Sequence, residues 1–174
     1  MNKLILVACF FLLIWPSTLA IPLNITKTNY ISDILHFSRV QRSVARRIED
    51  RLRKHRFSDG LIIGAIVNAY AESRLNTNAV GPGNSRGIFQ MTPSGLGHSM
   101  SIHEMHDVEA SSDRVAVAIK KNSRMMRAES IGADFETFTS IFCLEIERPA
   151  NKSLKALHRV ALLRSLTKKR RQYL

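Results

Sequence analysis

One apolar segment constrains the fold of this chain more than any other feature. Residues 61–71 read Leu-Ile-Ile-Gly-Ala-Ile-Val-Asn-Ala-Tyr-Ala and are apolar nearly all the way round a helical wheel. A buried strand is the alternative, but the segment's length, its alanines and glycine, and the capping sequence Ser58-Asp59-Gly60 favour a helix. A helix with almost no polar face is expected to run through the middle of a domain.

The rest of the chain predicts further helices around this segment. Residues 31–56 form an amphipathic pattern, with Arg42, Arg46 and Arg53 opposite the apolar residues. Shorter helices are expected over residues 112–128, 134–143 and 151–166. The apolar residues that we expect to face the core from these helices are Ile34, Phe37, Val40, Val44, Ile48, Leu52, Val115, Ile119, Met126, Phe135, Phe138, Phe142, Leu154, Leu157 and Ala161.

Size and composition fit a single folded domain. The chain has 174 residues, of which 45% are hydrophobic and 23% charged, so it can bury one core and is not a wholly disordered chain. Collagen, coiled-coil rods and multi-domain architectures are excluded. Lys and Arg outnumber Asp and Glu by 26 to 14, which gives a formal charge of +12. Such a charge favours an anionic partner, which can be a nucleic acid, a lipid surface or a polymer.

The N-terminus has the pattern of a secretory signal peptide. Lys3 precedes an apolar run that ends at Trp15, and small residues at positions 18 and 20 predict cleavage after Ala20. The run is shorter than the ~20 residues that a membrane-spanning helix needs. We therefore expect a secreted or periplasmic protein, for which nucleic acid is an unlikely partner. Cleavage also removes Cys9 and leaves Cys143 as the only thiol, so no intrachain disulfide is expected.

Glu72 follows the apolar helix directly. Burial against apolar neighbours and the negative end of the helix dipole both disfavour a carboxylate, so the sequence predicts a glutamate that keeps its proton near neutral pH. Protonation of a glycosidic oxygen needs such an acid. A surface glutamate at a frayed helix end is the alternative. A turn-rich stretch over 76–85 then leads to residues 87–91, which we expect to hold a short β-hairpin.

Two motifs resemble known families. Residues 68–81, Asn-Ala-Tyr-Ala-Glu-Ser-Arg-Leu-Asn-Thr-Asn-Ala-Val-Gly, and residues 84–91, Asn-Ser-Arg-Gly-Ile-Phe-Gln-Met, resemble the lysozyme-like peptidoglycan glycosidases, and more narrowly the soluble lytic transglycosylases and phage tail lysozymes. Residues 142–150 are similar to the Phe…Glu-Arg-Pro segment of phage tail lysozymes. The resemblance covers roughly residues 60–150. It implies a mainly α (α+β lysozyme-like) fold, with the hairpin beside an active-site cleft.

The resemblance also implies an activity and its site residues. The expected reaction is cleavage of the glycan strand of peptidoglycan between N-acetylmuramic acid and N-acetylglucosamine, with Glu72 as the catalytic acid and later the base. Ser73 would bind the sugar's N-acetyl group or orient Glu72, and Gln90 would bind polar groups of the glycan. Gly87 would let the backbone approach the substrate, and Phe89 would line the cleft. The Ala-Tyr-Asn motif of lytic transglycosylases is missing downstream, so lysozyme and transglycosylase products both stay open.

A second catalytic carboxylate is needed only if the enzyme is hydrolytic. The candidates are Asp107, Glu109, Glu145 and Glu147. Glu147 lies in the matched Glu-Arg-Pro segment, and an ion pair that fixes the fold is its alternative role. The cluster of His98, His103 and His106 lacks the ligand spacing of zinc hydrolases, so neither a metal nor a cofactor is expected. Cys143 has an apolar context and is expected to be a small core residue.

These predictions divide the chain into four parts: a signal peptide (1–20), a basic amphipathic N-terminal helix (21–57), a lysozyme-like catalytic domain (58–163) and a basic C-terminal tail (164–174). Peptidoglycan is the expected partner, with an anionic envelope or membrane surface as a possible second one for the basic helix and tail. We expect a monomer, and association with a virion stays open. The rival hypothesis is a non-catalytic cationic effector that binds envelopes through a lysozyme-like shell.

Overall fold

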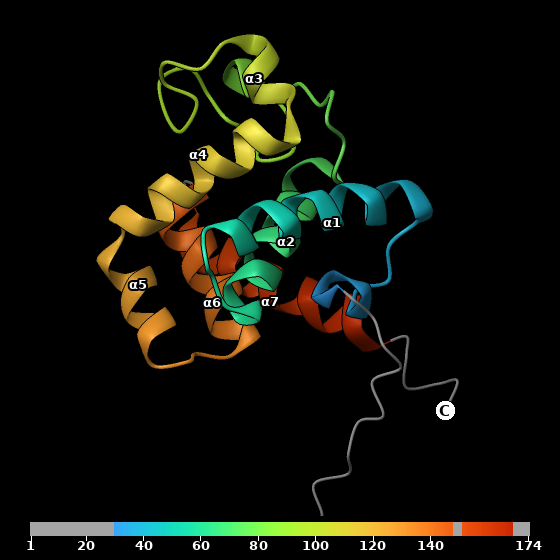
Figure 1. Ribbon diagram of the computed structural model, residues 1–174, viewed down its shortest axis with the longest axis vertical. Coiled ribbons are helices and arrows are strands. Elements are labelled where there is room, and N and C mark those ends of the chain that lie inside the picture. Colours follow the sequence, from blue (N-terminus) through green and yellow to red (C-terminus); the bar gives the residue numbers. More distant parts are fainter. Residues whose placement is uncertain (1–29, 148–150, 169–174) are drawn as a thin grey trace, which may run out of the picture.

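The computed structural model describes residues 30–147 and 151–168 (Figure 1). The expected signal peptide and residues 169–174 of the expected basic tail lie outside them. The described helices are α1 (Arg39–Lys54), α2 (Asp59–Ser73), α3 (Ile102–His106), α4 (Val108–Lys121), α5 (Ser123–Ser130), α6 (Phe135–Phe142) and α7 (Lys152–Lys168). Two short 3₁₀ helices, η1 (Ile31–Ile34) and η2 (Pro82–Asn84), and a π-helical turn, η3 (Cys143–Glu147), complete the set. The mostly helical fold class is confirmed.

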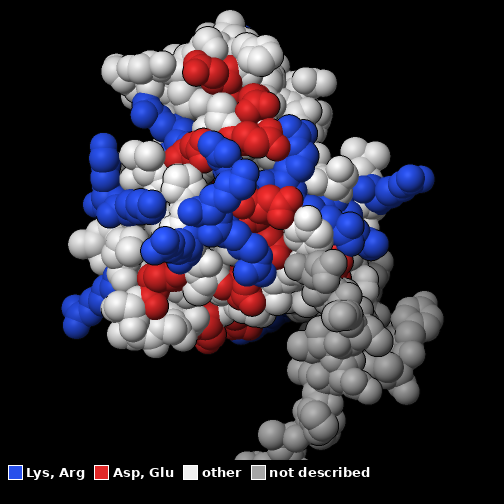
Figure 2. All heavy atoms as spheres, viewed as in Figure 1, with Lys and Arg blue, Asp and Glu red and all other residues white. Residues whose placement is uncertain are grey.

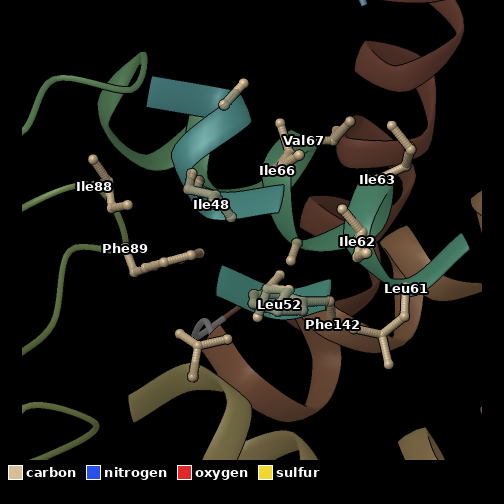
Figure 3. Packing of buried hydrophobic residues seen from close by; sticks show 14 of the residues in the cluster. Ile48, Leu52, Leu61, Ile62, Ile63, Ile66, Val67, Ile88, Phe89 and Phe142 are labelled. Carbon is tan, nitrogen blue, oxygen red and sulfur yellow. The ribbon is translucent and has the colours of Figure 1, made fainter. Parts of the chain in front are cut away.

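Helix α2 is the central helix that the apolar segment predicts. Every residue from Gly60 to Ala69 is buried. Helix α6 packs directly onto it because Gly64 has no side chain: a Cβ there would lie 3.0 Å from the backbone carbon of Phe138. Helices α1 and α7 also contact α2. Figure 3 shows side chains of α1, α2 and α6 meeting in one cluster, which Ile88 and Phe89 join from the loop after α2.

Helix α1 is amphipathic as predicted, but it begins later than the pattern suggests. Ser38 caps it, because its hydroxyl accepts from Gln41 N while the Gln41 side chain accepts from Ser38 N. The preceding residues form η1, which is tied to α1 by the buried Glu49. Of the predicted core residues here, Val40 is wrong: it is 74% exposed because it lies in the first turn of α1, beyond the core.

The arginines of α1 are largely neutralised by neighbouring acids. Arg46 pairs with Asp33, Arg47 with Glu109, Arg51 with Asp113, and Arg53 with Glu49 and Asp59. Figure 2 shows basic and acidic side chains interleaved across this face. Two of these ion pairs join α1 to α4. The charge of this helix therefore serves, in part, the packing of the fold.

The helix predicted over 112–128 is two helices. Asn122 ends α4 and caps α5, with its side-chain oxygen accepting from Met125 N at 2.9 Å. The break changes the helical phase, so Met125 is buried while the predicted core residue Met126 is 36% exposed. Val115 and Ile119, which precede the break, are fully buried as predicted.

Helix α7 is present as predicted, but its buried face is not the predicted one. Leu154 and Leu157 are 54% and 67% exposed, and Ala161 is also exposed. The buried face carries Ala156, Leu163 and Leu166 instead, together with Arg159, whose side chain is only 11% exposed. The helix is turned so that one arginine faces the interior. The helix extends to Lys168 and so includes Arg164, the first residue of the expected basic tail, which pairs with Glu136 of α6.

The expected β-hairpin is not seen among the described residues. Residues 80–91 instead form a compact loop with two isolated antiparallel bridges, from Val80 to Arg86 and from Arg86 to Met91. The backbone N–H of Gln90 donates to Gly87 O, which closes a tight turn at the point where a hairpin would need two continuing strands. Within residues 30–147 and 151–168, no helix is both long and apolar enough to cross a membrane.

Candidate active site

A cavity of about 540 Å³ opens beside the C-terminal end of α2. Its walls come from α2, the loop over 89–96, the end of α4, η3 and the start of α7. The lining residues are Glu72, Phe89, Gln90, Thr92, Gly95, Leu96, Ala118, Lys121, Asn122, Phe142, Glu145, Ile146, Glu147 and Lys155. The expected site residues Glu72, Phe89 and Gln90 thus line one cavity together with Glu145 and Glu147, two of the candidate second carboxylates.

Glu72 lies in the last turn of α2, where the helix leaves the core. Arg74 ends the helix in the left-handed conformation, with φ of 56°, and the chain then turns into the cavity loop. The Glu72 side chain is 24% exposed, so its carboxylate lies between the buried helix and solvent. This is the position that the sequence predicts.

Arg159 of α7 forms an ion pair with the Glu72 carboxylate. Its Nη2 donates both to Glu72 Oε1 and to Glu147 Oε2, the latter at 3.0 Å. The expectation that Glu72 meets only apolar neighbours and the helix end therefore left out an ion pair with a mostly buried arginine.

The orientation of Arg159 is fixed by a buried amide. Arg159 Nε donates to Asn68 Oδ1 at 3.2 Å, and Asn68 Nδ2 donates to Gly64 O at 2.7 Å and Thr139 O at 3.0 Å. These partners also fix which end of the Asn68 amide carries the oxygen. One asparagine thus links α2, α6 and the guanidinium of α7.

Glu147 is the most deeply buried acid of the cavity. Burial raises its pKa to about 7, and the negative charge of Glu72 adds to this effect, while Arg159 opposes it. No hydrogen-bond partner among the described residues reaches its Oε1 atom, although this oxygen is buried. The π-helical turn carries Glu147 to the cavity wall directly after α6. The neighbouring Cys143 is fully buried, as expected of a small core residue, and burial raises the pKa of its thiol to about 12.

Phe89 and Gln90 line the cavity from the loop that follows α2. Phe89 is mostly buried and stacks on Phe142, with ring centroids 6.3 Å apart. The Gln90 side chain is half-buried and is held by its own loop, because its oxygen accepts from Ser85 Oγ and its nitrogen donates to Gly87 O. One N–H of this amide is left free of these contacts and can face a ligand.

Ser73 and Gly87 support the loop and do not line the cavity. Ser73 Oγ is within hydrogen-bond distance of Ala69 O and Ile88 O, at 3.1 and 2.9 Å, so it ties the end of α2 to the loop. Gly87 has φ of +69°, and a Cβ on it would lie 1.9 Å from Met105 O of α3. The structure gives this glycine a packing reason that the sequence does not reveal.

A comparison with protein-family models shows to which family the chain belongs. Residues 43–172 match the model of the phage tail lysozymes. The chain belongs to the phage tail lysozyme family. No curated protein and no solved structure matched in the corresponding comparisons. The family match starts within α1 and is wider than the motifs over 60–150 that carry the resemblance.

Membership in this family makes the protein lysozyme-like, with a glycosidase kind of activity on peptidoglycan. The helical fold fits this assignment. Of the further candidates in this phage tail lysozyme, Glu145 lines the cavity and pairs with Arg124. Asp107 and Glu109 lie near Arg47, outside the cavity lining. Among the described residues, no group of three His, Cys, Asp or Glu side chains could hold a metal ion.

Glu147 is expected to make stability depend on pH in a specific direction. The folded state binds its proton more tightly than the unfolded chain does, because its pKa rises from 4.5 to about 7. Its contribution is thus complete at low pH and is lost as the pH rises to about 7. We therefore expect the unfolding free energy to fall between pH 4.5 and 7 because of this group, by an amount on the order of 1 kcal/mol or more.

Denaturant unfolding at a series of pH values measures this effect. The unfolding free energy of wild type should fall relative to that of Glu147→Gln as the pH rises, because the amide resembles the protonated acid and does not titrate. Glu136→Gln is the matched control, since Glu136 pairs with Arg164 outside the cavity. Parallel curves for wild type and Glu147→Gln would contradict the prediction.

Proposed function

We propose that this protein cleaves the glycan strand of peptidoglycan between N-acetylmuramic acid and N-acetylglucosamine, with Glu72 as general acid and then general base. The observation that carries the proposal is the position of Glu72, at the end of the buried helix and in the wall of the cavity that Phe89 and Gln90 also line. An aromatic ring, an amide and an acid in one cavity suit a sugar chain, which offers both apolar faces and polar edges.

The chemistry follows from what a glycosidic bond needs in order to break. Proton donation from Glu72 to the bridging oxygen makes the departing sugar a neutral alcohol, while positive charge develops on the ring carbon. The Glu72 carboxylate then accepts a proton from the attacking hydroxyl group. When that hydroxyl belongs to water, the product has a reducing end; when it is the sugar's own 6-hydroxyl, a 1,6-anhydro end forms.

Glu147 is poorly placed to be the second carboxylate of an inverting hydrolase. Both glutamates bind the same nitrogen of Arg159, so their nearest oxygens are less than two hydrogen-bond lengths, about 6 Å, apart. An inverting enzyme needs roughly 6.5–9.5 Å to fit a water molecule and the sugar between its carboxyl groups. The separation instead falls close to the roughly 5–5.5 Å of a retaining pair, so the group that assists Glu72 is either Glu147 or the acetamido oxygen of the sugar.

Digestion of purified sacculi tests the proposal against the cationic effector. The secreted form should release soluble muropeptides, and mass spectrometry should find either anhydro or reducing muramyl ends. Release should continue near 1 M salt, where the Debye length is only about 3 Å and adhesion by charge is screened. Disruption of intact cells that disappears at this salt concentration, with no covalent product from sacculi, would favour the effector.

Two lysines give the cavity a preference for charged substrate. Lys121 and Lys155 line it, are exposed, and have no ion-pair partner among the described residues. The carboxylates of peptide stems on the glycan would meet them. We expect Lys121→Gln combined with Lys155→Gln to lower kcat/KM on stem-bearing glycan about three- to tenfold, and to leave cleavage of stem-free oligosaccharides unchanged. Lys54→Gln, outside the cavity lining, is the control, and equal losses on both substrates would contradict this preference.

A further inference from the structure

The least expected feature of the cavity is that one guanidinium nitrogen serves two carboxylates. Nη2 of Arg159 donates to Glu72 and to Glu147, while Nε donates to Asn68. We propose that Arg159 is a positioning residue that holds Glu72 at the cavity wall, and that its charge, shared between two glutamates, sets the upper pH limit of activity. This inference rests on the proposed function.

The placement of Arg159 sets it apart from the other arginines that pair with acids. Its side chain is 11% exposed, whereas the arginines of the other ion pairs are 33% exposed or more. Helix α7 turns Arg159 inward and leaves Leu154 and Leu157 exposed. Such an arrangement forgoes apolar burial on α7 in exchange for a guanidinium held in one orientation.

The charges around the pair do not balance when both glutamates are ionised. Two carboxylates then share one guanidinium in a mostly buried setting, so a proton on one of them lowers the repulsion. The other titratable or charged groups that face the cluster are Cys143 and Glu145 on η3, Lys121 on α4 and Lys155 on α7. Glu145 is paired with Arg124, and the lysines are exposed on the cavity rim.

A positive charge beside a carboxyl group disfavours the neutral form that donates a proton, so the charge of Arg159 should restrict activity to lower pH. Removing the charge should extend activity to higher pH. Removing only the fork geometry should lower turnover without moving that limit, because the charge stays in place. Charge and geometry can therefore be separated by two substitutions.

The experiment measures kcat and kcat/KM on soluble muropeptide between pH 4 and 9. In Arg159→Gln we expect kcat at the optimum to fall about tenfold and the alkaline limb of the pH profile to move to higher pH. In Arg159→Lys we expect a similar fall in kcat with the limb unmoved. Arg164→Gln, which removes a surface arginine of the same helix, should change neither. Falls in kcat with the limb unmoved in Arg159→Gln would reduce Arg159 to a structural role and overturn the proposal.

A measurement on the wild-type protein keeps the test independent of variant folding and of activity. Carbon NMR of the glutamate carboxyl groups should show Glu147 titrating near pH 7, with the Glu72 resonance responding to the same step. An unresponsive Glu72 resonance would overturn the shared contact. If wild type released no glycan fragments while the two resonances titrated together, the proposed function would fail and the coupling through Arg159 would stand.

Discussion

Glu72→Gln is expected to lower the release of glycan fragments by about a thousandfold, within the range that general acid–base groups contribute. The amide cannot donate a proton to a glycosidic oxygen or accept one from water. It keeps the shape of the side chain, and its oxygen can still accept the Arg159 hydrogen bond that the carboxylate accepts. The measurement is turnover of purified sacculi with quantification of muropeptides.

Folding should survive this substitution. Arg159 keeps Glu147 and Asn68 as partners, so no guanidinium is left without an acceptor. We expect the melting temperature of Glu72→Gln to stay within a few degrees of wild type. Glu136→Gln also removes one carboxylate that pairs with an arginine, but away from the cavity, and should keep full activity. Unchanged turnover by a folded Glu72→Gln variant would refute Glu72 as the acid.

Local patterns account for the part of the site that the sequence predicts. The apolar run of α2 places Glu72 at a helix end, and the Gly-Ile-Phe-Gln motif brings Phe89 and Gln90 to the same cavity. Each of these placements depends on residues that are close in the sequence. The helical pattern of residues 61–71 predicts the first placement, and the resemblance to the lysozyme-like glycosidases implies the second.

The position of Arg159 in the cavity could not be predicted from the sequence. It lies 87 residues after Glu72, and an arginine on an amphipathic helix indicates a solvent-facing side. The apolar residues Leu154 and Leu157 therefore suggested the wrong buried face for α7. The buried face of α7 is decided by its packing against α2 and α6. That packing brings Asn68, Glu72 and Glu147 within hydrogen-bond distance of the Arg159 guanidinium. A lone basic residue between Ala156 and Leu163 on one helical face was the available signal.

Gly87→Ala is expected to give the largest loss of stability among these variants, more than about 2 kcal/mol. A methyl group would have to occupy the space of Met105 O, which lies 1.9 Å from the Cβ position, and backbone cannot move aside as a flexible side chain can. The φ of +69° adds the strain of a left-handed alanine, about 1 kcal/mol. Denaturant unfolding measures the total.

Gly83→Ala separates the two causes. Gly83 has φ of +64°, close to that of Gly87, but nothing lies within 4 Å of its Cβ position, so it should lose only the conformational part, about 1 kcal/mol. The excess loss in Gly87→Ala then measures the contact between the cavity loop and α3. Because Gly87 O accepts from Gln90, displacement of this glycine should also reduce activity. An alanine that lowers activity while leaving stability at the Gly83→Ala level would instead assign Gly87 to substrate approach, as the resemblance implies.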